Sequence, residues 1–328
     1  MNKIKIGLSM GDPNGVGLEI ILTVFEDKAL YKLITPILFA PKNTVEFQKK
    51  HLKKQIKLNF VNDINHINEG LLNVFEIPDH NFKTNFGVQC KKAGSLSLDS
   101  LSKSVEAIKN QVVDVLVTAP INKKSIQSDK FKFPGHTDYL NKNFDGQKLM
   151  FMISDELKIA LVTDHIPIDK ISSMVSKDII ISKINQVQTS LKNDFGIIEP
   201  KIAILGMNPH CGDGGVIGNE DDTIIKPCIC ETQKNKINVD GPFAADSFFG
   251  AEKHKKYDAI IAIYHDQGLI PFKTLSFGKG VNFTGGLNLV RTSPDHGTAF
   301  DIAGQGVACP TSYKSAILES IKIYKNRN

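Results

Sequence analysis

The sequence has no long apolar run, few cysteines and no low-complexity tail. No stretch is apolar over a length that spans a bilayer, and the opening residues are too interrupted for the apolar core of a signal peptide. We therefore expect a cytoplasmic protein. The cysteines form an odd, scattered set that excludes a disulfide framework and that we expect to stay reduced: Cys90, Cys211, Cys228, Cys230 and Cys309.

A strong excess of charge of one sign is also missing. The 40 basic and 35 acidic residues leave a net charge of +5. This charge suits an anionic substrate or cofactor but is too small and too dispersed to indicate nucleic acid. The length of 328 residues, 41% of them hydrophobic, is typical of a globular protein with two domains.

Short β-branched runs alternate with segments of helical period along the chain. This alternation is typical of βαβ units and predicts an α/β fold with mostly parallel sheets. The expected strands are 5–9, 36–40, 113–118, 159–163, 201–205 and 259–264. The expected helices include 18–26, 95–110, 168–195 and 312–324. No linker marks a boundary, so the chain is expected to cross between its domains more than once.

Three of the expected strands end close to a histidine: His165, His210 and His265. The ends of strands in an open α/β sheet converge on one edge, where ligands bind. Three imidazoles on that edge indicate a divalent metal with open coordination positions. Each histidine alone is more often a structural residue, so the spacing leaves both interpretations open.

Several loops carry groups that suit an anion. Residues 11–19 are rich in glycine and run into a helix whose exposed amides could meet an anion, although a tight turn explains the loop as well. Residues 295–306 combine glycines with acidic groups and a histidine, as in a nucleotide loop. Lys123, in a segment that also fits a helix-capping turn, could address a phosphate or carboxylate. Lys273 and Arg291 can hold a phosphate, with surface solvation as the alternative.

Six segments, taken in order, resemble the 4-hydroxythreonine-4-phosphate dehydrogenase family of pyridoxal phosphate biosynthesis: 11–15, 119–123, 135–137, 208–210, 264–268 and 291–299. The resemblance runs over nearly the whole chain. It implies an isocitrate and isopropylmalate dehydrogenase-like fold, with two α/β/α domains, mostly parallel sheets and an active site in the interdomain cleft. Residues 1–130 and 285–328 are then expected to form the nucleotide-side domain. Residues 131–284 are expected to form the metal, substrate and dimerisation domain.

The resemblance also implies ligands, residue by residue. A divalent metal, which is zinc, magnesium or cobalt, is expected on His165, His210 and His265, in a site shared between the subunits of a homodimer. The substrate contacts fall on His136, Thr137, Lys273, Asn282 and Arg291. The contacts to NAD or NADP fall on Gly11, Asp12, His296, Gly297, Thr298 and Ala299.

The implied reaction is NAD(P)-dependent oxidation of 4-phosphooxy-L-threonine, followed by decarboxylation to 3-amino-2-oxopropyl phosphate. The metal would act as a Lewis acid on the substrate oxygen in both steps. Candidates for the proton acceptor are Lys273 and Asp246, and Asp246 is equally able to orient a ligating histidine.

Other functions would use many of the same residues. A paralogous dehydrogenase acting on a phosphorylated sugar acid, such as 4-phosphoerythronate, or on phosphothreonate would keep the metal and the cofactor. A metal-dependent phosphohydrolase would need a metal-activated water and no nicotinamide. A purely structural zinc usually has four protein ligands rich in cysteine, and no fourth ligand is evident here.

Overall fold

The structure, a computed structural model, describes residues 3–328, and its contacts divide the chain into two compact units. Unit 1 comprises the described residues up to Gly146 together with Asn288–Tyr324. Unit 2 comprises Gln147–Leu287 and Lys325–Asn328. The divisions fall after residues 146 and 287, against the expected 130 and 284. The roles expected for the two domains stay predictions.

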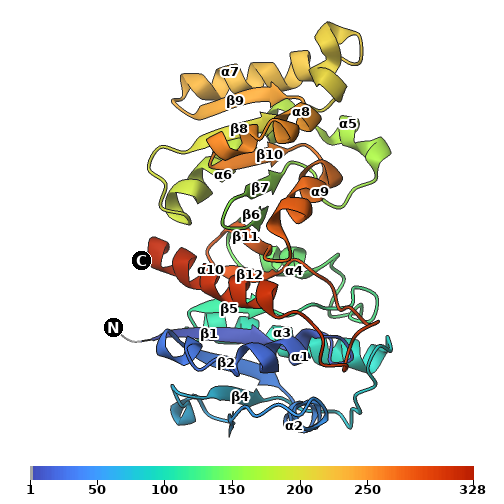
Figure 1. The fold of residues 1–328 in the computed structure, drawn as a ribbon, viewed down its shortest axis with the longest axis vertical. Coiled ribbons are helices and arrows are strands. Elements are labelled where there is room, and N and C mark those ends of the chain that lie inside the picture. Colours follow the sequence, from blue (N-terminus) through green and yellow to red (C-terminus); the bar gives the residue numbers. More distant parts are fainter. Residues whose placement is uncertain (1–2) are drawn as a thin grey trace. The chain divides into compact units, whose positions relative to one another are not determined.

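Unit 1 contains a parallel sheet with the strand order β3-β4-β2-β1-β5-β12 (Figure 1). The strands are β1 (Ile4–Ser9), β2 (Ile34–Ala40), β3 (Leu58–Val61), β4 (Leu72–Glu76), β5 (Val115–Thr118) and β12 (Arg291–Pro294). Each of these strands runs parallel to its neighbours. Every residue of β2 and of β5 is buried, as expected for parallel strands with helices on both faces.

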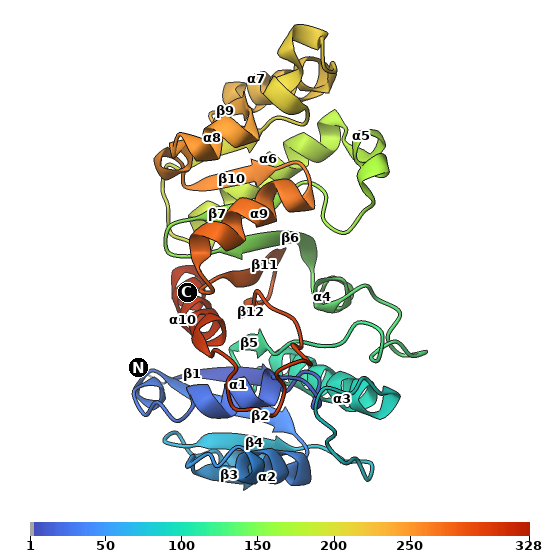
Figure 2. The same cartoon turned by 45° about the vertical axis from the view of Figure 1, so that its right-hand side comes forward.

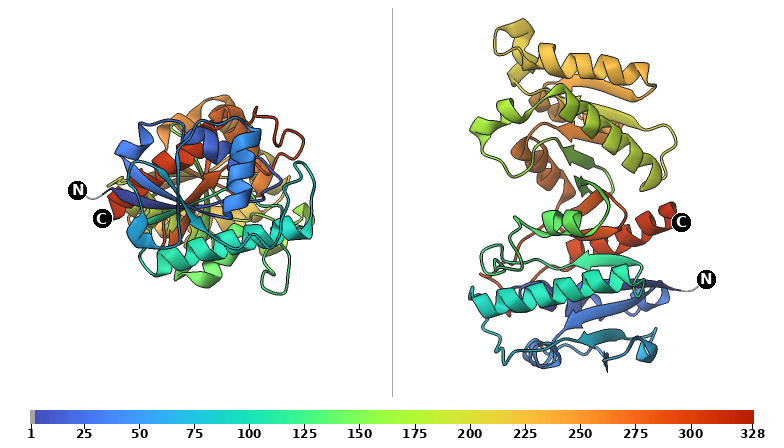
Figure 3. Two further views of the ribbon diagram at one scale, coloured as in Figure 1. Left: turned by 90° about the horizontal axis from the view of Figure 1, so that it is seen from below. Right: turned by 180° about the vertical axis from the view of Figure 1, so that it is seen from behind.

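Helices cover both faces of this sheet. The helices of unit 1 are α1 (Gly17–Val24), α2 (Lys42–His51), α3 (Lys91–Lys109), α4 (His136–Asn143) and α10 (Thr311–Arg327), and its short turns are η1 (Leu30–Lys32) and η2 (Ile64–His66). The long helix α3 lies on the face opposite to α10 (Figure 3). It packs against β1, β2 and β5. This arrangement leaves the strand ends of the sheet for loops that carry polar side chains.

Unit 2 contains a mostly parallel sheet with the strand order β11-β6-β7-β10-β8-β9. The strands are β6 (Gly146–Ile153), β7 (Lys158–Leu161), β8 (Lys201–Leu205), β9 (Asn238–Phe243), β10 (Ala259–Ala262) and β11 (Val281–Leu287). The pairing of β6 with β7 is antiparallel, whereas β7, β10, β8 and β9 are parallel. The predicted α/β class with mostly parallel sheets is confirmed, and so are the expected central strands of both units.

The helices of unit 2 also lie on two faces, with α9 opposite to α6 (Figure 2). They are α5 (Ile171–Met174), α6 (Lys177–Asn193), α7 (Lys226–Lys234), α8 (Ala245–Gly250) and α9 (His265–Ser276). The short turns are η3 (Ile168–Lys170), η4 (Pro209–Gly215), η5 (Asp221–Ile225) and η6 (Lys253–Lys256). Phe248 of α8 and Phe272 of α9 are buried against apolar residues of β7, β8 and β10, which anchors this layer.

The prediction of one helix over 168–195 is wrong. The segment divides into η3, α5 and α6, because Val175 and Ser176 have extended backbone. The Ser176 hydroxyl accepts a hydrogen bond from Ile179 N and caps α6, so the helix begins anew at this point. The apolar spacing continues through the break, which is why periodicity alone did not detect it.

Two further observations concern the chain as a whole. The cysteines at the five positions noted above are free thiols in the structure. Within residues 3–328, no helix is both long enough and apolar enough to cross a membrane.

Candidate active site

In unit 2 the parallel strands β7, β10, β8 and β9 are neighbours, so their carboxyl ends lie on one edge of the sheet. Each end is followed by a residue singled out in the sequence. His165 follows β7, His265 follows β10, His210 follows β8 and Asp246 follows β9. We call this edge, with these four residues, the histidine edge. The expected convergence of the three histidine-bearing strand ends is therefore present in the strand order.

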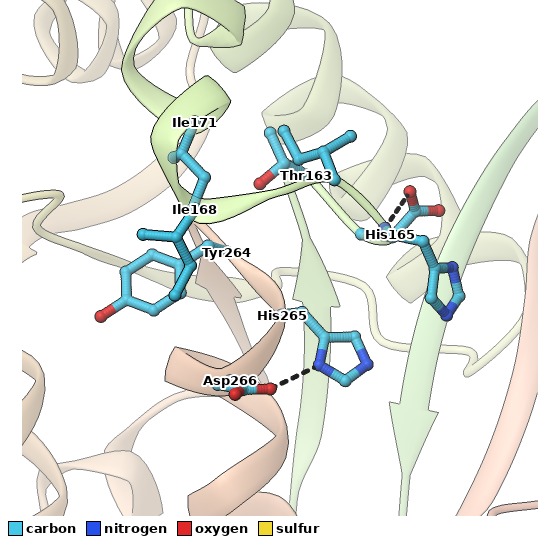
Figure 4. A pocket seen from close by; sticks show the side chains of 9 residues that line it. Thr163, His165, Ile168, Ile171, Tyr264, His265 and Asp266 are labelled. Carbon is cyan, nitrogen blue, oxygen red and sulfur yellow. Dashed lines mark hydrogen bonds and ion pairs between the residues drawn. The ribbon is translucent and has the colours of Figure 1, made fainter.

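A cavity of about 230 Å³ opens at the histidine edge (Figure 4). His165 and His265 line it, with ring centroids 5.5 Å apart and ring planes inclined by 44°. His265 Nδ1 lies 2.7 Å from Asp266 Oδ1. Because an ionised carboxylate only accepts, Nδ1 donates to Asp266, and in the neutral imidazole Nε2 then carries the lone pair. The other lining residues are Thr163, Asp164, Ile166, Ile168, Ile171, Tyr264 and Asp266.

Asp164 fixes the backbone of His165. Its Oδ1 accepts a hydrogen bond from His165 N at 2.7 Å, and its Oδ2 lies 4.0 Å from Lys148 Nζ. Burial raises the pKa of the Asp164 carboxyl, but this hydrogen bond and the charges of Lys148, His165 and Lys183 outweigh burial and lower that pKa overall. Burial lowers the pKa of Lys183. His165 therefore lies beside a carboxylate that stays ionised at neutral pH.

His210 lies in the turn η4, outside the residues that line this cavity. It is exposed and has a left-handed backbone, with φ of 51°. The loop before it is held by the fully buried Asp221, which accepts hydrogen bonds from Met207 N at 2.7 Å and Asn208 N at 3.0 Å. Among residues 3–328, no three His, Cys, Asp or Glu side chains lie together in a way that could hold a metal ion.

Gln267 joins two strand ends of the histidine edge. Its Oε1 accepts a hydrogen bond from Ile263 N at 2.7 Å, and its Nε2 donates one to Gly206 O at 2.6 Å. A single side chain thus links the end of β10 to the end of β8. The loops that carry His265 and His210 start from a fixed spacing.

A second group of candidate residues lies in unit 1, around the ends of β5 and β12. Arg291 is buried, and burial lowers the pKa of its guanidinium to about 9. The Thr118 hydroxyl accepts hydrogen bonds from Arg291 Nε at 3.1 Å and from Nη2 at 2.6 Å. Burial, and then the charges of Arg291 and Lys123, hold the pKa of His136 well below its usual value. We call Thr118, Lys123, His136 and Arg291 the basic cluster.

The basic cluster has the chemistry of an anion site. His136 begins α4, and its Nε2 atom is buried and has no hydrogen-bond partner among residues 3–328. Buried polar atoms are usually satisfied, so the unsatisfied Nε2 makes His136 a candidate for contact with a ligand. Thr137 follows on the same first helical turn. A neutral imidazole beside a guanidinium and an ammonium can donate to an anion without adding a third cation.

The two glycine-rich loops pack against each other in unit 1. Val16 N donates a hydrogen bond to Thr298 O at 3.0 Å. A Cβ on Gly15 would lie 2.7 Å from the same oxygen, so only glycine allows this approach. Asp12 is fully buried, and its Oδ2 accepts a hydrogen bond from Ser125 Oγ at 3.2 Å. Asp12 thus supports the first loop from inside the protein.

A buried carboxylate holds the second loop in place. Glu19 of α1 accepts hydrogen bonds from Gly304 N at 3.0 Å and from Ala308 N at 3.1 Å. The structure therefore brings together loops that are nearly the whole chain apart in sequence. The other residues expected to contact the cofactor lie in the same two loops: Gly11, His296, Gly297 and Ala299.

The remaining candidates lie in unit 2. Lys273 is exposed in the last turn of α9, about 12 Å along the helix axis from His265. Asn282 lies on β11, and its Oδ1 is buried without a hydrogen-bond partner in the described part of the chain. Asp246 is exposed on α8. Burial, and to a smaller extent nearby carboxylates that include Asp246, raise the pKa of Cys211, the residue after His210.

Comparison with known proteins identifies the family. Residues 32–319 match the family model described as pyridoxal phosphate biosynthetic protein PdxA. A 4-hydroxythreonine-4-phosphate dehydrogenase of Bacteroides thetaiotaomicron is 43% identical over 328 residues, covering 99% of this chain and 90% of that protein. The chain belongs to the PdxA family.

Further members of the PdxA family match over nearly their whole length. A protein of the same name from Sulfurihydrogenibium sp. is 37% identical, covering 99% of each chain. The crystal structure of the Klebsiella pneumoniae 4-hydroxythreonine-4-phosphate dehydrogenase aligns with a TM-score of 0.85 at 29% identity, covering 99% of this chain and 98% of that one. Relatives named as dehydrogenases indicate a nicotinamide cofactor, and their name is consistent with a small phosphorylated substrate.

Sequence reasoning did not assign four residues that organise the site of this PdxA-family chain: Glu19, Thr118, Asp221 and Gln267. Gln267 lies within the segment 264–268, Thr118 ends the expected strand 113–118, and Glu19 ends the glycine-rich segment 11–19. The sequence did not show the hydrogen-bond partner of each residue, because that partner is far away along the chain. Thr118 and Arg291 are 173 positions apart, and Glu19 and Gly304 are 285 apart.

Proposed function

We propose that this chain oxidises 4-phosphooxy-L-threonine with NAD or NADP and decarboxylates the product to 3-amino-2-oxopropyl phosphate, in pyridoxal phosphate biosynthesis. The observation that carries the proposal is the match to proteins named 4-hydroxythreonine-4-phosphate dehydrogenase, over 99% of the chain at 43% identity. The basic cluster and the paired histidines supply the chemistry that a phosphorylated hydroxy acid needs.

The histidine edge is the proposed site of a divalent metal. His165 and His265 fit such an ion, because their rings are adjacent and Asp266 leaves Nε2 of His265 available. His210, from the neighbouring strand end, is the proposed third ligand. Imidazole donors favour zinc or cobalt over magnesium. When bound, the ion supplies Lewis-acid polarisation of the substrate oxygen.

The protein's own residues bind and orient the substrate. Arg291 and neutral His136, with Thr137, hold anionic groups of the substrate, and Thr118 keeps the guanidinium in one orientation. Lys273 and Asn282 complete the proposed set of substrate contacts. The proton of the substrate hydroxyl passes to Lys273 or Asp246, the two candidate bases.

The packed glycine-rich loops of unit 1 are the proposed nucleotide site. Gly11, His296, Gly297, Thr298 and Ala299 lie in these loops, and backbone amides at the start of α1 suit a pyrophosphate. Asp12 acts by shaping the first loop, since its side chain is fully buried. A homodimer with a shared metal site and a cytoplasmic location complete the proposal.

The test is the absorbance of NADH in a reaction with 4-phosphooxy-L-threonine, NAD and Co²⁺ or Zn²⁺. We expect metal-dependent NADH formation that EDTA abolishes. His165→Ala should lose activity by at least about 100-fold, whereas His66→Ala, an exposed histidine of unit 1, should match the wild type. Activity only with 4-phosphoerythronate or phosphothreonate would change the substrate. Phosphate release without NADH would favour a hydrolase instead.

A further inference from the structure

Lys123 is a cation of the basic cluster that the proposed function leaves without a role. Its side chain is exposed, and it takes part in no ion pair with a carboxylate anywhere in residues 3–328. The adjacent Lys124 is equally exposed. An exposed lysine usually needs no explanation, but the backbone and side chain of Lys123 are held in a particular place.

The backbone around Lys123 is fixed by a dense set of hydrogen bonds. The Asn122 Oδ1 atom accepts from Lys124 N at 3.1 Å and from Ser125 N at 2.9 Å. Gln127 Nε2 donates to Lys123 O at 3.3 Å. On the inner side the turn packs tightly on α3, because a Cβ on Gly94 would lie 2.0 Å from Ser125 O. The turn therefore presents Lys123 from a constant position.

The side chain of Lys123 runs toward the N-terminus of α4. Its Cε lies 3.9 Å from the position that a Cβ on Gly135 would take, and Gly135 is the cap residue of that helix. As a glycine, Gly135 has no side chain that could cap this end of α4. The ammonium group thus lies near the positive end of the helix dipole. A cation is unfavourable there unless an anion is bound.

Arg291 and His136 belong to the same surroundings as Lys123. The charges of Lys123 and Arg291 both act on His136, whose Nε2 is buried and has no partner in the described residues. Two cations whose charges both act on one neutral imidazole also repel each other in the free protein. An anion with two negative charges reverses this repulsion, and a phosphate monoester also suits the point charge of a lysine.

We infer that Lys123 binds the phosphate group of the substrate together with Arg291 and His136. This inference rests on the proposed function for the identity of the substrate, but the binding of phosphate itself does not depend on turnover. Lys123 sets the preference for phosphorylated over unphosphorylated hydroxy acids. Arg291, which is buried and held by Thr118, gives the direction of the bound anion, and Lys123 adds charge from the solvent side.

The experiment measures the affinity for inorganic phosphate by isothermal titration calorimetry, in the wild type, Lys123→Met, Lys123→Arg and Lys124→Met. We expect Lys123→Met to weaken phosphate binding roughly tenfold, as for the loss of one charge-assisted hydrogen bond. Lys123→Arg should recover part of the loss, and Lys124→Met should bind as the wild type does. Equal phosphate affinity in Lys123→Met and the wild type would overturn the inference.

Steady-state kinetics separate this inference from the proposed function. With 4-phosphooxy-L-threonine, Lys123→Met should raise KM for the substrate roughly tenfold and leave KM for NAD unchanged. A rise in substrate KM without any change in phosphate affinity would place Lys123 on the carboxylate and overturn the phosphate assignment. If the wild type binds phosphate through Lys123 but oxidises nothing, the proposed function fails while the phosphate contact stands.

Discussion

The Thr118 hydroxyl accepts two hydrogen bonds from one edge of the Arg291 guanidinium, from Nε and Nη2. Both residues are buried, so the guanidinium has lost most of its water and depends on protein atoms for its orientation. A hydroxyl in this position accepts hydrogen bonds from two of the guanidinium donors and, being uncharged, does not neutralise the positive charge. Thr118 thus orients the Arg291 guanidinium without placing a negative charge beside it, which a carboxylate in the place of Thr118 would do.

Thr118→Val should therefore leave the shape of the site and remove the acceptor. We expect the free energy of unfolding to fall by about 1–3 kcal/mol, because buried donors of Arg291 lose their partner. Affinity for inorganic phosphate should fall as well, since the guanidinium is no longer held. Urea denaturation and calorimetry measure the two effects.

The control for this prediction is Thr118→Ser, which keeps the hydroxyl and removes only a methyl group. It should retain phosphate affinity close to that of the wild type, although a small cavity lowers its stability. If Thr118→Val binds phosphate as tightly as Thr118→Ser does, the hydroxyl does not position Arg291.

Residue types showed where anion-binding groups occur in the sequence, but not which of them meet. Arg291 could be proposed as a phosphate ligand from its chemistry and its motif, and this assignment stays a prediction. Its contact with Thr118 requires β12 to pair with β5, and β12 has the sequence RTSP, which lacks the apolar pattern of a strand. The hydrogen bond therefore depends on a pairing that local propensity does not predict.

Among the elements, the contact between α1 and the loop before α10 is the one that assembles the proposed nucleotide site. Glu19 lies in the first turn of α1, where a carboxylate is favourable near the positive end of the helix. Its oxygens accept two backbone N–H groups of the second loop, from Gly304 and Ala308. The charge of Glu19 is thus balanced by backbone dipoles.

Glu19→Gln should loosen this loop without changing the substrate site. The amide keeps one acceptor oxygen, but its NH₂ group meets a backbone donor where the carboxylate accepted a hydrogen bond. We expect KM for NAD to rise roughly tenfold, with kcat and the substrate KM changed by less than about twofold. Initial-rate kinetics with each substrate varied in turn measure the split. Glu46→Gln, an exposed change on α2, serves as the charge-matched control.

A proportional rise in both KM values would contradict this prediction, since it would mean that Glu19 supports the whole of unit 1. Gly15 gives an independent check of the same contact. Its Cα lies close enough to Thr298 that a Cβ would meet the Thr298 carbonyl. Gly15→Ala should therefore weaken the binding of NAD, as Glu19→Gln does.

The elements that could be predicted from the sequence are those with a continuous apolar run or a clear helical period. The central strands β1, β2, β5, β7, β8 and β10 belong to this class. Several strands that were missed are short, polar or interrupted: β9 contains glycine and proline, and β11 contains two glycines. β6 was missed as well, although its last five residues are apolar. Their pairing comes from the neighbouring strands rather than from their own composition.

At the scale of the whole molecule, the residues proposed to bind the nucleotide and those proposed to bind the metal belong to different units. The residues expected to bind the nucleotide, 11–12 and 296–299, lie in unit 1, and the three histidines lie in unit 2. That the units are discontinuous could be inferred from the absence of a linker. Which candidate groups approach one another within each unit could not, because it depends on strand order and on side-chain contacts such as Gln267 with Gly206.

Hydrogen exchange measured by mass spectrometry can therefore separate the two ligands. NAD should protect residues 11–19 and 296–308, because backbone amides of these loops become hydrogen-bonded or less mobile when the nucleotide binds. Co²⁺ should protect the strand ends at 163–166, 206–211 and 263–267. His165→Ala should lose the protection by Co²⁺ and keep the protection by NAD. A mutant that loses both would have a folding defect, and Co²⁺ protection that survives in His165→Ala would place the metal on other ligands.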